Sequence, residues 1–166
     1  TSKGQIIINH NYSIMATTSP GTSNGKATTI KKTFSRETSI SIEINSNPSI
    51  IWALLTNASD FPRWNSTVIS IEADIIAGGK INLKSTLDPK RTFKLKVKEF
   101  QPENKLAWGD AMGNRVYTIT KTSTGSALFY MTEKIGGPLF PLFARMIPSF
   151  DKSFEQFAAD LKKEAE

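Results

Sequence analysis

GGPLFPLFARMIPSFDKSFEQFAADLKKEAE, residues 136–166, carries the strongest helical pattern in the chain. Apolar side chains recur there at spacings of three and four, which places them on one stripe of a helix. They are Phe143, Met146, Ile147, Phe150, Phe154, Phe157 and Leu161. A stripe this aromatic needs a large apolar partner. It therefore predicts a C-terminal helix packed on a sheet formed earlier in the chain.

Pro148 interrupts this pattern because proline cannot donate a backbone hydrogen bond and clashes with the preceding turn. We expect a short helix over about 141–147, a break, and a long helix over about 149–165. Ser149 is the candidate N-cap, and Lys162 and Lys163 suit the negative end of the helix. Two interpretations of the aromatic stripe stay open, ordinary core and partial lining of a ligand cavity.

Composition narrows the function classes. The chain has no cysteine, which excludes disulfides, a thiol nucleophile and zinc–thiolate sites, and it has one histidine, His10. Residues 1–35 are rich in small polar residues and turn formers, so we predict a flexible tail there and a single domain over 36–166. A catalytic triad or a histidine metal site would require the tail to fold over the domain. We therefore expect no metal and no cofactor.

The net charge of +6 permits weak attraction to acidic partners, but no nucleic-acid motif is present. No apolar run is long enough to span a bilayer, and the N-terminus does not resemble a signal peptide. We expect a cytoplasmic protein without stable membrane insertion. The oligomeric state is open.

Alternating apolar residues predict a first strand over 39–45, and Asn47-Pro48 then predicts a capped helix with a short helical turn at 58–61. Further strands are expected over 66–76, 80–86, 92–100, 106–108, 114–121 and 126–135. A turn at Asp88-Pro89 would place Leu83 opposite Leu95 and Ile81 opposite Val97. The alternating Lys94, Lys96 and Lys98 then form a solvated stripe.

The link 123–125 reads as a three-residue hairpin with Gly125 in the left-handed conformation. This register pairs Ile119 with Phe129, Tyr117 with Met131, and Arg115 with Glu133, all on one face. Four of these side chains are apolar or amphipathic, so the face is expected to point inward and to end in a charge pair.

Five motifs, in this order, resemble the START-like (SRPBCC) superfamily, which includes polyketide cyclase/dehydrase-like and birch-pollen-allergen-like proteins. The motifs are NPSIIWALL (47–55), DFPRWN (60–65), GG (78–79), PENKLAW (102–108) and TEKIGG (132–137). The resemblance implies an α+β helix-grip fold. In that fold a curved antiparallel sheet of about six to seven strands wraps a long C-terminal helix, and two short helices follow the first strand.

The resemblance also implies an apolar cavity between sheet and helix, and thus binding or transport of a hydrophobic molecule such as a lipid or polyketide. The residues expected to line it are Trp52, Trp64, Phe93, Leu95, Tyr117, Ile119, Phe129, Met131, Phe140, Phe143, Met146 and Phe150. Two alternatives stay open. One is a cyclase or aromatase moving protons with Glu133, Arg115 or Tyr117, although Arg115 and Glu133 also suit a structural pair. The other is a protein-interaction module that uses the lysine stripe.

Overall fold

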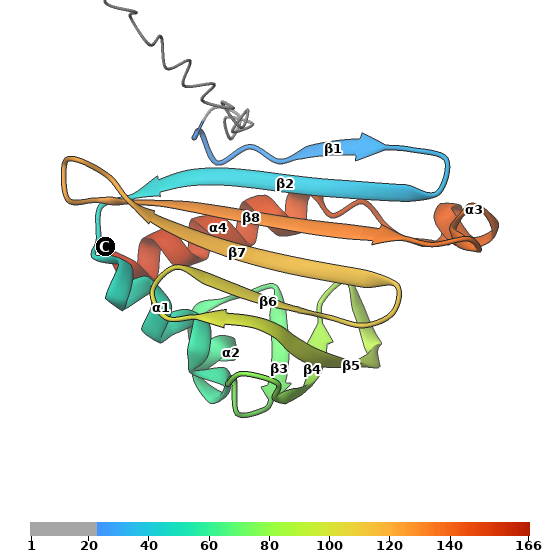
Figure 1. Ribbon diagram of the computed structural model, residues 1–166, viewed down its shortest axis with the longest axis horizontal. Coiled ribbons are helices and arrows are strands. Elements are labelled where there is room, and N and C mark those ends of the chain that lie inside the picture. The colour runs from blue at the N-terminus through green and yellow to red at the C-terminus, as the bar shows by residue number, and fades with distance from the viewer. Residues whose placement is uncertain (1–22) are drawn as a thin grey trace, which may run out of the picture.

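The computed structural model describes residues 23–166 and shows one curled antiparallel sheet with a helix in its grip (Figure 1). The strands are β1 Thr28–Lys31, β2 Ser35–Ile44, β3 Val68–Glu72, β4 Lys80–Ser85, β5 Asp88–Gln101, β6 Lys105–Gly109, β7 Gly113–Lys121 and β8 Ala127–Gly136. The helices are α1 Pro48–Thr56, η1 Ala58–Asp60, α2 Phe61–Trp64, α3 Phe140–Phe143, η2 Ala144–Met146 and α4 Asp151–Ala165.

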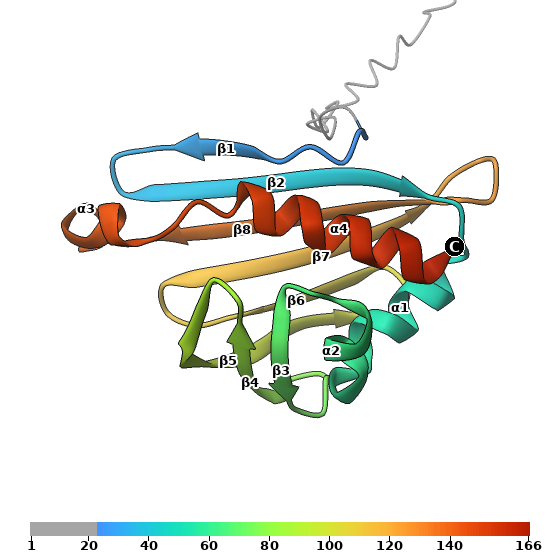
Figure 2. The same ribbon diagram turned by 180° about the vertical axis from the view of Figure 1, so that it is seen from behind.

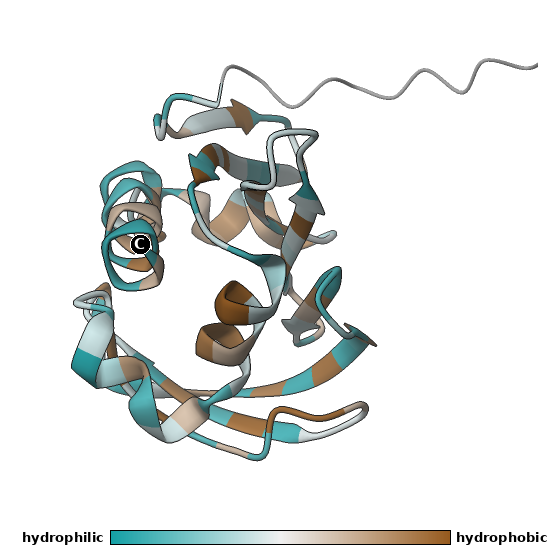
Figure 3. Cartoon of the chain, turned by 90° about the vertical axis from the view of Figure 1, so that its left-hand side faces the viewer, coloured by the Kyte–Doolittle hydropathy of each residue, from teal (hydrophilic) through white to brown (hydrophobic). Residues whose placement is uncertain are grey.

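Within residues 23–166 the strand order is β1-β2-β8-β7-β6-β5-β4-β3. Helix α4 lies on the concave face, over β2, β8 and β7, while α1 and α2 sit near its C-terminal end and α3 near the other (Figure 2). The view along α4 from its C-terminal end shows the sheet curling around it (Figure 3). The predicted helix-grip architecture is confirmed, with one strand more than the largest expected number.

The additional strand is β1, which lies inside the predicted tail. It pairs with β2, with Thr28 opposite Ser39. Its start is tied to α4, because the backbone N–H of Ala27 donates to Glu155 Oε1 at 3.1 Å. β1 is mostly exposed and its sequence lacks the alternation of apolar residues that predicts a strand, so it could not be predicted from that pattern. Residues 1–22 of the predicted tail, including His10, lie outside the described residues, so the flexible tail there stays a prediction.

The helix break at Pro148 is confirmed, but α4 begins at Asp151 rather than at Ser149. The Ser149 hydroxyl still accepts a hydrogen bond, at 3.4 Å, from the Asp151 backbone N–H. At α1 the prediction holds residue by residue. The Asn47 side chain accepts from the Ser49 N–H at 3.1 Å, and Pro48 occupies the first helical position.

The β7–β8 register is confirmed, with Arg115 opposite Glu133, and Gly125 has a φ of 90° in the hairpin. The predicted β4–β5 register is wrong by two residues. Ile81 lies opposite Leu95 because β5 already begins at Asp88, which moves the turn to residues 86–87. A shift of two keeps each side chain on its face, so the predicted inward positions survive.

Two predicted strand ends also differ. β2 begins at Ser35 instead of residue 39. The apolar alternation does not reveal this earlier start, because the first inward side chains are the polar Arg36 and Thr38. β3 covers only Val68–Glu72 of the predicted 66–76. Ser66 instead binds α4, since its backbone N–H donates to Asp160 Oδ2 at 2.8 Å.

An aromatic cluster fixes α4 to the sheet. Phe157 lies at its centre, with ring centroids 5.7 Å from Tyr117, 6.4 Å from Phe129, 6.0 Å from Trp64 and 6.3 Å from Phe61. These side chains are buried and come from α4, β7, β8 and α2. The middle of the concave face is therefore filled by protein side chains.

Replacing Phe157 with Ala should lower the free energy of unfolding by about 3–5 kcal/mol, because it opens a cavity where four elements meet. Urea unfolding measures this loss. Lys163→Ala, at an exposed position of the same helix, is the control and should change stability by less than about 0.5 kcal/mol. A loss below about 1 kcal/mol for Phe157→Ala would contradict the packing of α4 described here.

Candidate functional site

Polar side chains gather on the concave face near the N-terminal end of α4. Arg36 and Thr38 come from β2, Arg115 and Tyr117 from β7, and Glu133 from β8, and we call these five the inner polar cluster. Glu133 lies opposite both Thr38 and Arg115 in the sheet register. Residues directly opposite in an antiparallel sheet share a face, so all five point toward α4.

Glu133 and Arg115 form an ion pair in which Nε and Nη2 of Arg115 both contact Oε2 of Glu133, the former at 2.5 Å. Burial lowers the pKa of Arg115, but Glu133 and Tyr117 together outweigh burial, so the net shift is upward and the guanidinium stays charged. The guanidinium also lies 5.1 Å from the centroid of the Phe154 ring on α4. Each partner keeps 18% of its side chain exposed, so the pair is reachable from solvent.

Arg36 holds the link between η2 and α4. Its Nη1 donates to the carbonyl of Ile147 at 3.2 Å and its Nη2 to that of Pro148 at 2.7 Å. The guanidinium stacks 4.9 Å from the Phe150 ring centroid. Burial lowers the Arg36 pKa, and Asp151 and Glu133 oppose that shift. Arg36 thus fixes the point where the chain turns into the long helix.

The Tyr117 hydroxyl is the least satisfied group of the cluster. The side chain is 1% exposed, and within residues 23–166 its oxygen makes no hydrogen bond of good geometry; the Arg115 guanidinium lies close enough to lower its pKa as a donor would, but the phenol O–H has no acceptor. Burial raises the Tyr117 pKa to about 12, with Arg115 pulling it partly back. The phenol is therefore neutral at physiological pH and able to donate a hydrogen bond. The indole N–H of Trp64, which also packs on Phe157, likewise has no partner there.

The residues predicted to line a cavity fall into two sets, of which the first is packed into the core. Ile119, Phe129 and Met131 are buried beneath α4 with Tyr117. Trp64 contacts Phe157. These side chains are brought together, but as neighbours in a filled core.

The second set lies toward the ends and edges of the grip. Phe93 and Leu95 are half-buried on the concave side of β5, and Trp52 packs edge-on against Phe100 with centroids 5.1 Å apart. Phe140 is buried, with Phe143 edge-on to it, and Phe150 stacks on Phe154. Met146 is 81% exposed. A common lining formed by all twelve residues stays a prediction.

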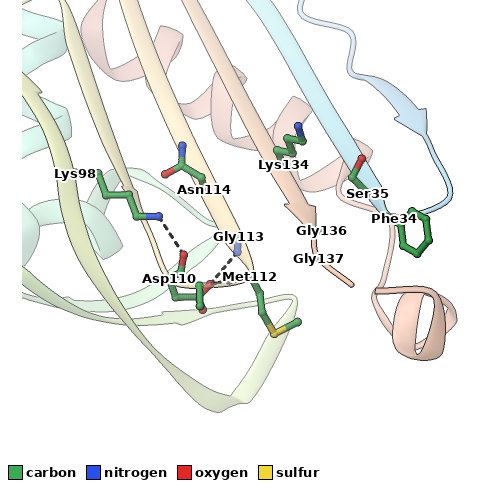
Figure 4. A pocket seen from close by; sticks show the side chains of 11 residues that line it. Phe34, Ser35, Lys98, Asp110, Met112, Gly113, Asn114, Lys134, Gly136 and Gly137 are labelled. Carbon is green, nitrogen blue, oxygen red and sulfur yellow. Dashed lines mark hydrogen bonds between the residues drawn. The ribbon is translucent and has the colours of Figure 1, made fainter. Parts of the chain in front are cut away.

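Two hollows stand out on the described surface, and no predicted cavity residue lines either one. The first, of about 390 Å³, is bordered by Lys98, Asp110, Asn114 and Lys134 (Figure 4). Asn114 and Lys134 alternate with Arg115 and Glu133 along their strands, so this hollow is on the convex side of the sheet. The second, of about 480 Å³, lies between 56–59 and 73–76.

Sequence reasoning missed Arg36 and Thr38 as members of the cluster. The strand alternation could have identified them, because Arg36 and Thr38 lie an even number of residues before Ile40 and therefore share the strand face of Ile40, Ile42 and Ile44. Within residues 23–166, no group of three or more His, Cys, Asp or Glu side chains is placed to hold a metal ion.

Solved structures with the same fold share little sequence with this chain. A conserved protein of unknown function from Enterococcus faecalis matches with a TM-score of 0.62 and 15% identity, covering 85% of this chain and 77% of that one. A START superfamily protein from Mycobacterium smegmatis matches with a TM-score of 0.58 and 14% identity, covering 78% of this chain and 94% of that one. A norcoclaurine synthase point mutant from Thalictrum, in complex with a transition-state analogue, matches with a TM-score of 0.59 and 13% identity. That match covers 83% of this chain and 96% of the synthase.

At these identities the likeness establishes the fold alone, and no curated protein matches the chain. A family model described as polyketide cyclase/dehydrase and lipid transport matches residues 35–166. That range runs from the first residue of β2 to the end of α4 and includes the whole inner polar cluster. The chain therefore belongs to the polyketide cyclase/dehydrase and lipid transport family.

Proposed function

We propose that this protein binds a hydrophobic small molecule with one polar end, held at the concave face beside the N-terminal half of α4. The observation that carries the proposal is the buried Tyr117 hydroxyl, whose O–H has no acceptor among the described residues and which adjoins the Arg115–Glu133 pair. Ligand sites combine apolar walls with a few convergent polar groups. The family description, which includes lipid transport, supports the same class of ligand.

The apolar part of the ligand would lie against side chains that α4 leaves partly uncovered. Leu83, Phe93 and Leu95 are half-buried, and their registers place them on the concave side of β4 and β5. Phe157 and the rings packed on it fill the middle of the face, so the polar end of the ligand would approach the Tyr117 hydroxyl from the side of the partly exposed Arg115–Glu133 pair. Burial of apolar ligand surface contributes about 25 cal/mol per Å² before the entropic costs of binding, so the apolar wall supplies affinity and the cluster supplies orientation.

The Tyr117→Phe variant tests the role of the hydroxyl. Binding of the aromatic dye anilinonaphthalene sulfonate is measured by fluorescence titration. We expect wild-type protein to bind one dye molecule and the variant to bind about tenfold more weakly, because a hydrogen bond to a charged group is lost. Tyr130→Phe, on the opposite face of β8, is the matched control and should bind like wild type. Equal affinity in all three proteins would remove Tyr117 from the site.

The free energy of unfolding should depend on alkaline pH differently in wild type and in Tyr117→Phe. The raised Tyr117 pKa means that the unfolded chain ionises near the ordinary value of about 10 and the folded chain at about 12. The folded state binds more protons in this window, so stability is full below about pH 10 and falls by up to about 2–3 kcal/mol by about pH 12. Urea unfolding across this range should show that loss in wild type and not in Tyr117→Phe. Parallel curves would contradict it.

A second candidate is proton-transfer catalysis of the cyclase type, and it rests on Glu133. Oε2 of this carboxylate binds Arg115, whereas Oε1 accepts no hydrogen bond from residues 23–166. Oε1 faces Gly113, where an added Cβ would stand 3.9 Å away, at ordinary contact distance. A carboxylate with one unoccupied oxygen next to a neutral phenol can act as a base.

If the protein cyclises polyketide chains, Glu133→Gln should lower kcat at least about 100-fold with little change in KM, because the base is lost while binding groups remain. Product formation from a linear polyketide substrate measures this. Glu99→Gln, in a surface pair with Lys105, is the control. Retained kcat in a folded Glu133→Gln variant would exclude this candidate.

A further inference from the structure

Exposed apolar side chains gather at the end of the molecule farthest from the C-terminus. Phe34, Met112, Leu139, Leu142 and Met146 account for five of the nine large hydrophobic residues exposed in the described chain, and we call them the apolar tip. Leu142 is 80% exposed and Met146 81%. Side chains this apolar and this open mark an interaction surface when they occur together.

Backbone contacts show that the three segments carrying the tip adjoin one another. Phe34 is in the β1–β2 turn, Met112 in the β6–β7 turn, and the other three in the segment from β8 to α4 (Figure 1). Gly137 N–H donates to the carbonyl of Phe34 at 3.0 Å, and Gly136 N–H to that of Met112 at 2.9 Å. Phe34 and Met112 also border the same hollow (Figure 4).

The segment α3–η2 is apolar on both its inner and its outer side. Phe140 is buried and Phe143 packs edge-on against it at 6.0 Å, which together form the inner side. Leu139, Leu142 and Met146 point away from the core. Apart from Arg145 the segment is apolar on both sides, and a helical segment that is apolar all round normally lies within a protein core or a membrane. Here no part of residues 23–166 covers the outer side.

Basic residues surround the tip. Lys31 and Lys32 precede Phe34, Arg145 precedes Met146, and all three are exposed. Lys98 and Lys134 border the hollow beside Met112. No acidic residue occurs in 30–36 or between 134 and 150.

The nearby carboxylates are mostly engaged. Asp110 accepts the N–H groups of Met112 and Gly113, each at 2.8 Å, and Asp151 binds the Thr29 hydroxyl. Glu133 is paired with Arg115, and Glu37 lies opposite Lys134 on the neighbouring strand. The surface presented around the tip is therefore apolar at its centre and basic at its rim.

We propose that the apolar tip docks on the surface of an anionic phospholipid bilayer, with Leu142 and Met146 entering the interface and the basic rim meeting lipid phosphates. The charge complementarity favours this occupant, because interfacial protein segments combine an inserted apolar face with Lys and Arg at the headgroups. No described helix is long and apolar enough to cross a membrane, which makes the contact peripheral.

Vesicle co-sedimentation of the full chain tests the proposal. The probes are phosphatidylcholine vesicles with and without roughly one third phosphatidylglycerol. Wild type should bind the anionic vesicles at least about tenfold more tightly than the neutral ones, and Leu142→Asp/Met146→Asp should lose at least about tenfold. Arg145→Glu should weaken binding about fivefold or more, and about 0.5 M salt should reduce this difference.

Ile50→Asp is the matched control, since Ile50 is an exposed apolar residue on α1, away from the tip, and its substitution should leave vesicle binding unchanged. Circular dichroism checks that the surface variants remain folded. Equal binding to both vesicle types, or equal loss in Ile50→Asp, would overturn the proposal. So would a wild type that ignores vesicles but forms dimers that Leu142→Asp/Met146→Asp dissociates, because the tip would then join two copies of the chain. The test does not depend on the Tyr117 site.

Discussion

One helix has to cover the concave face of a sheet that is much wider than the helix. Eight strands at about 4.8 Å spacing make a sheet roughly 34 Å wide, whereas a helix with its side chains is about 10 Å across, and the 15 residues of α4 reach only about 22 Å. Curling brings more strands within reach, and α1 and α2 fill one end, α2 with Phe61 and Trp64. The remaining concave surface, around β4 and β5, stays half-buried, and the apolar part of the proposed ligand would lie there.

Two arginines, Arg36 and Arg115, lie on the concave face of the sheet beside α4. Burying an arginine is costly unless hydrogen bonds and opposite charge compensate for lost water. Arg36 meets this condition with two backbone carbonyls of the η2–α4 link, and Arg115 with Glu133. Both guanidinium groups also lie over phenylalanine rings of the α4 region. The polar cluster therefore positions the start of α4, and the Tyr117 O–H is the donor of the cluster that has no acceptor among the described residues.

Local signals predicted much of this fold from sequence. Asn47-Pro48 specified the start of α1, and the three-residue link ending in Gly125 set the β7–β8 register, because short-range backbone chemistry decides both. Predictions failed where long-range contacts decide. β1 depends on pairing with β2 and on Glu155 of α4, and the β4–β5 turn depends on sheet curvature that no dipeptide encodes. Arg36 was overlooked because an inward arginine needs partners from a distant link. Met146 was assigned to a cavity because periodicity identifies a stripe and not what covers it.

Native mass spectrometry of the freshly purified protein, followed by organic extraction after unfolding, tests the central claim most directly. The account predicts a single defined adduct, released on unfolding, whose chemistry combines an apolar body with one polar group. Incubation with fatty acids and aromatic polyketides should load any fraction that emerges empty. Protein that is free of adduct as purified and takes up none of these compounds would contradict the claim that this grip holds a hydrophobic ligand.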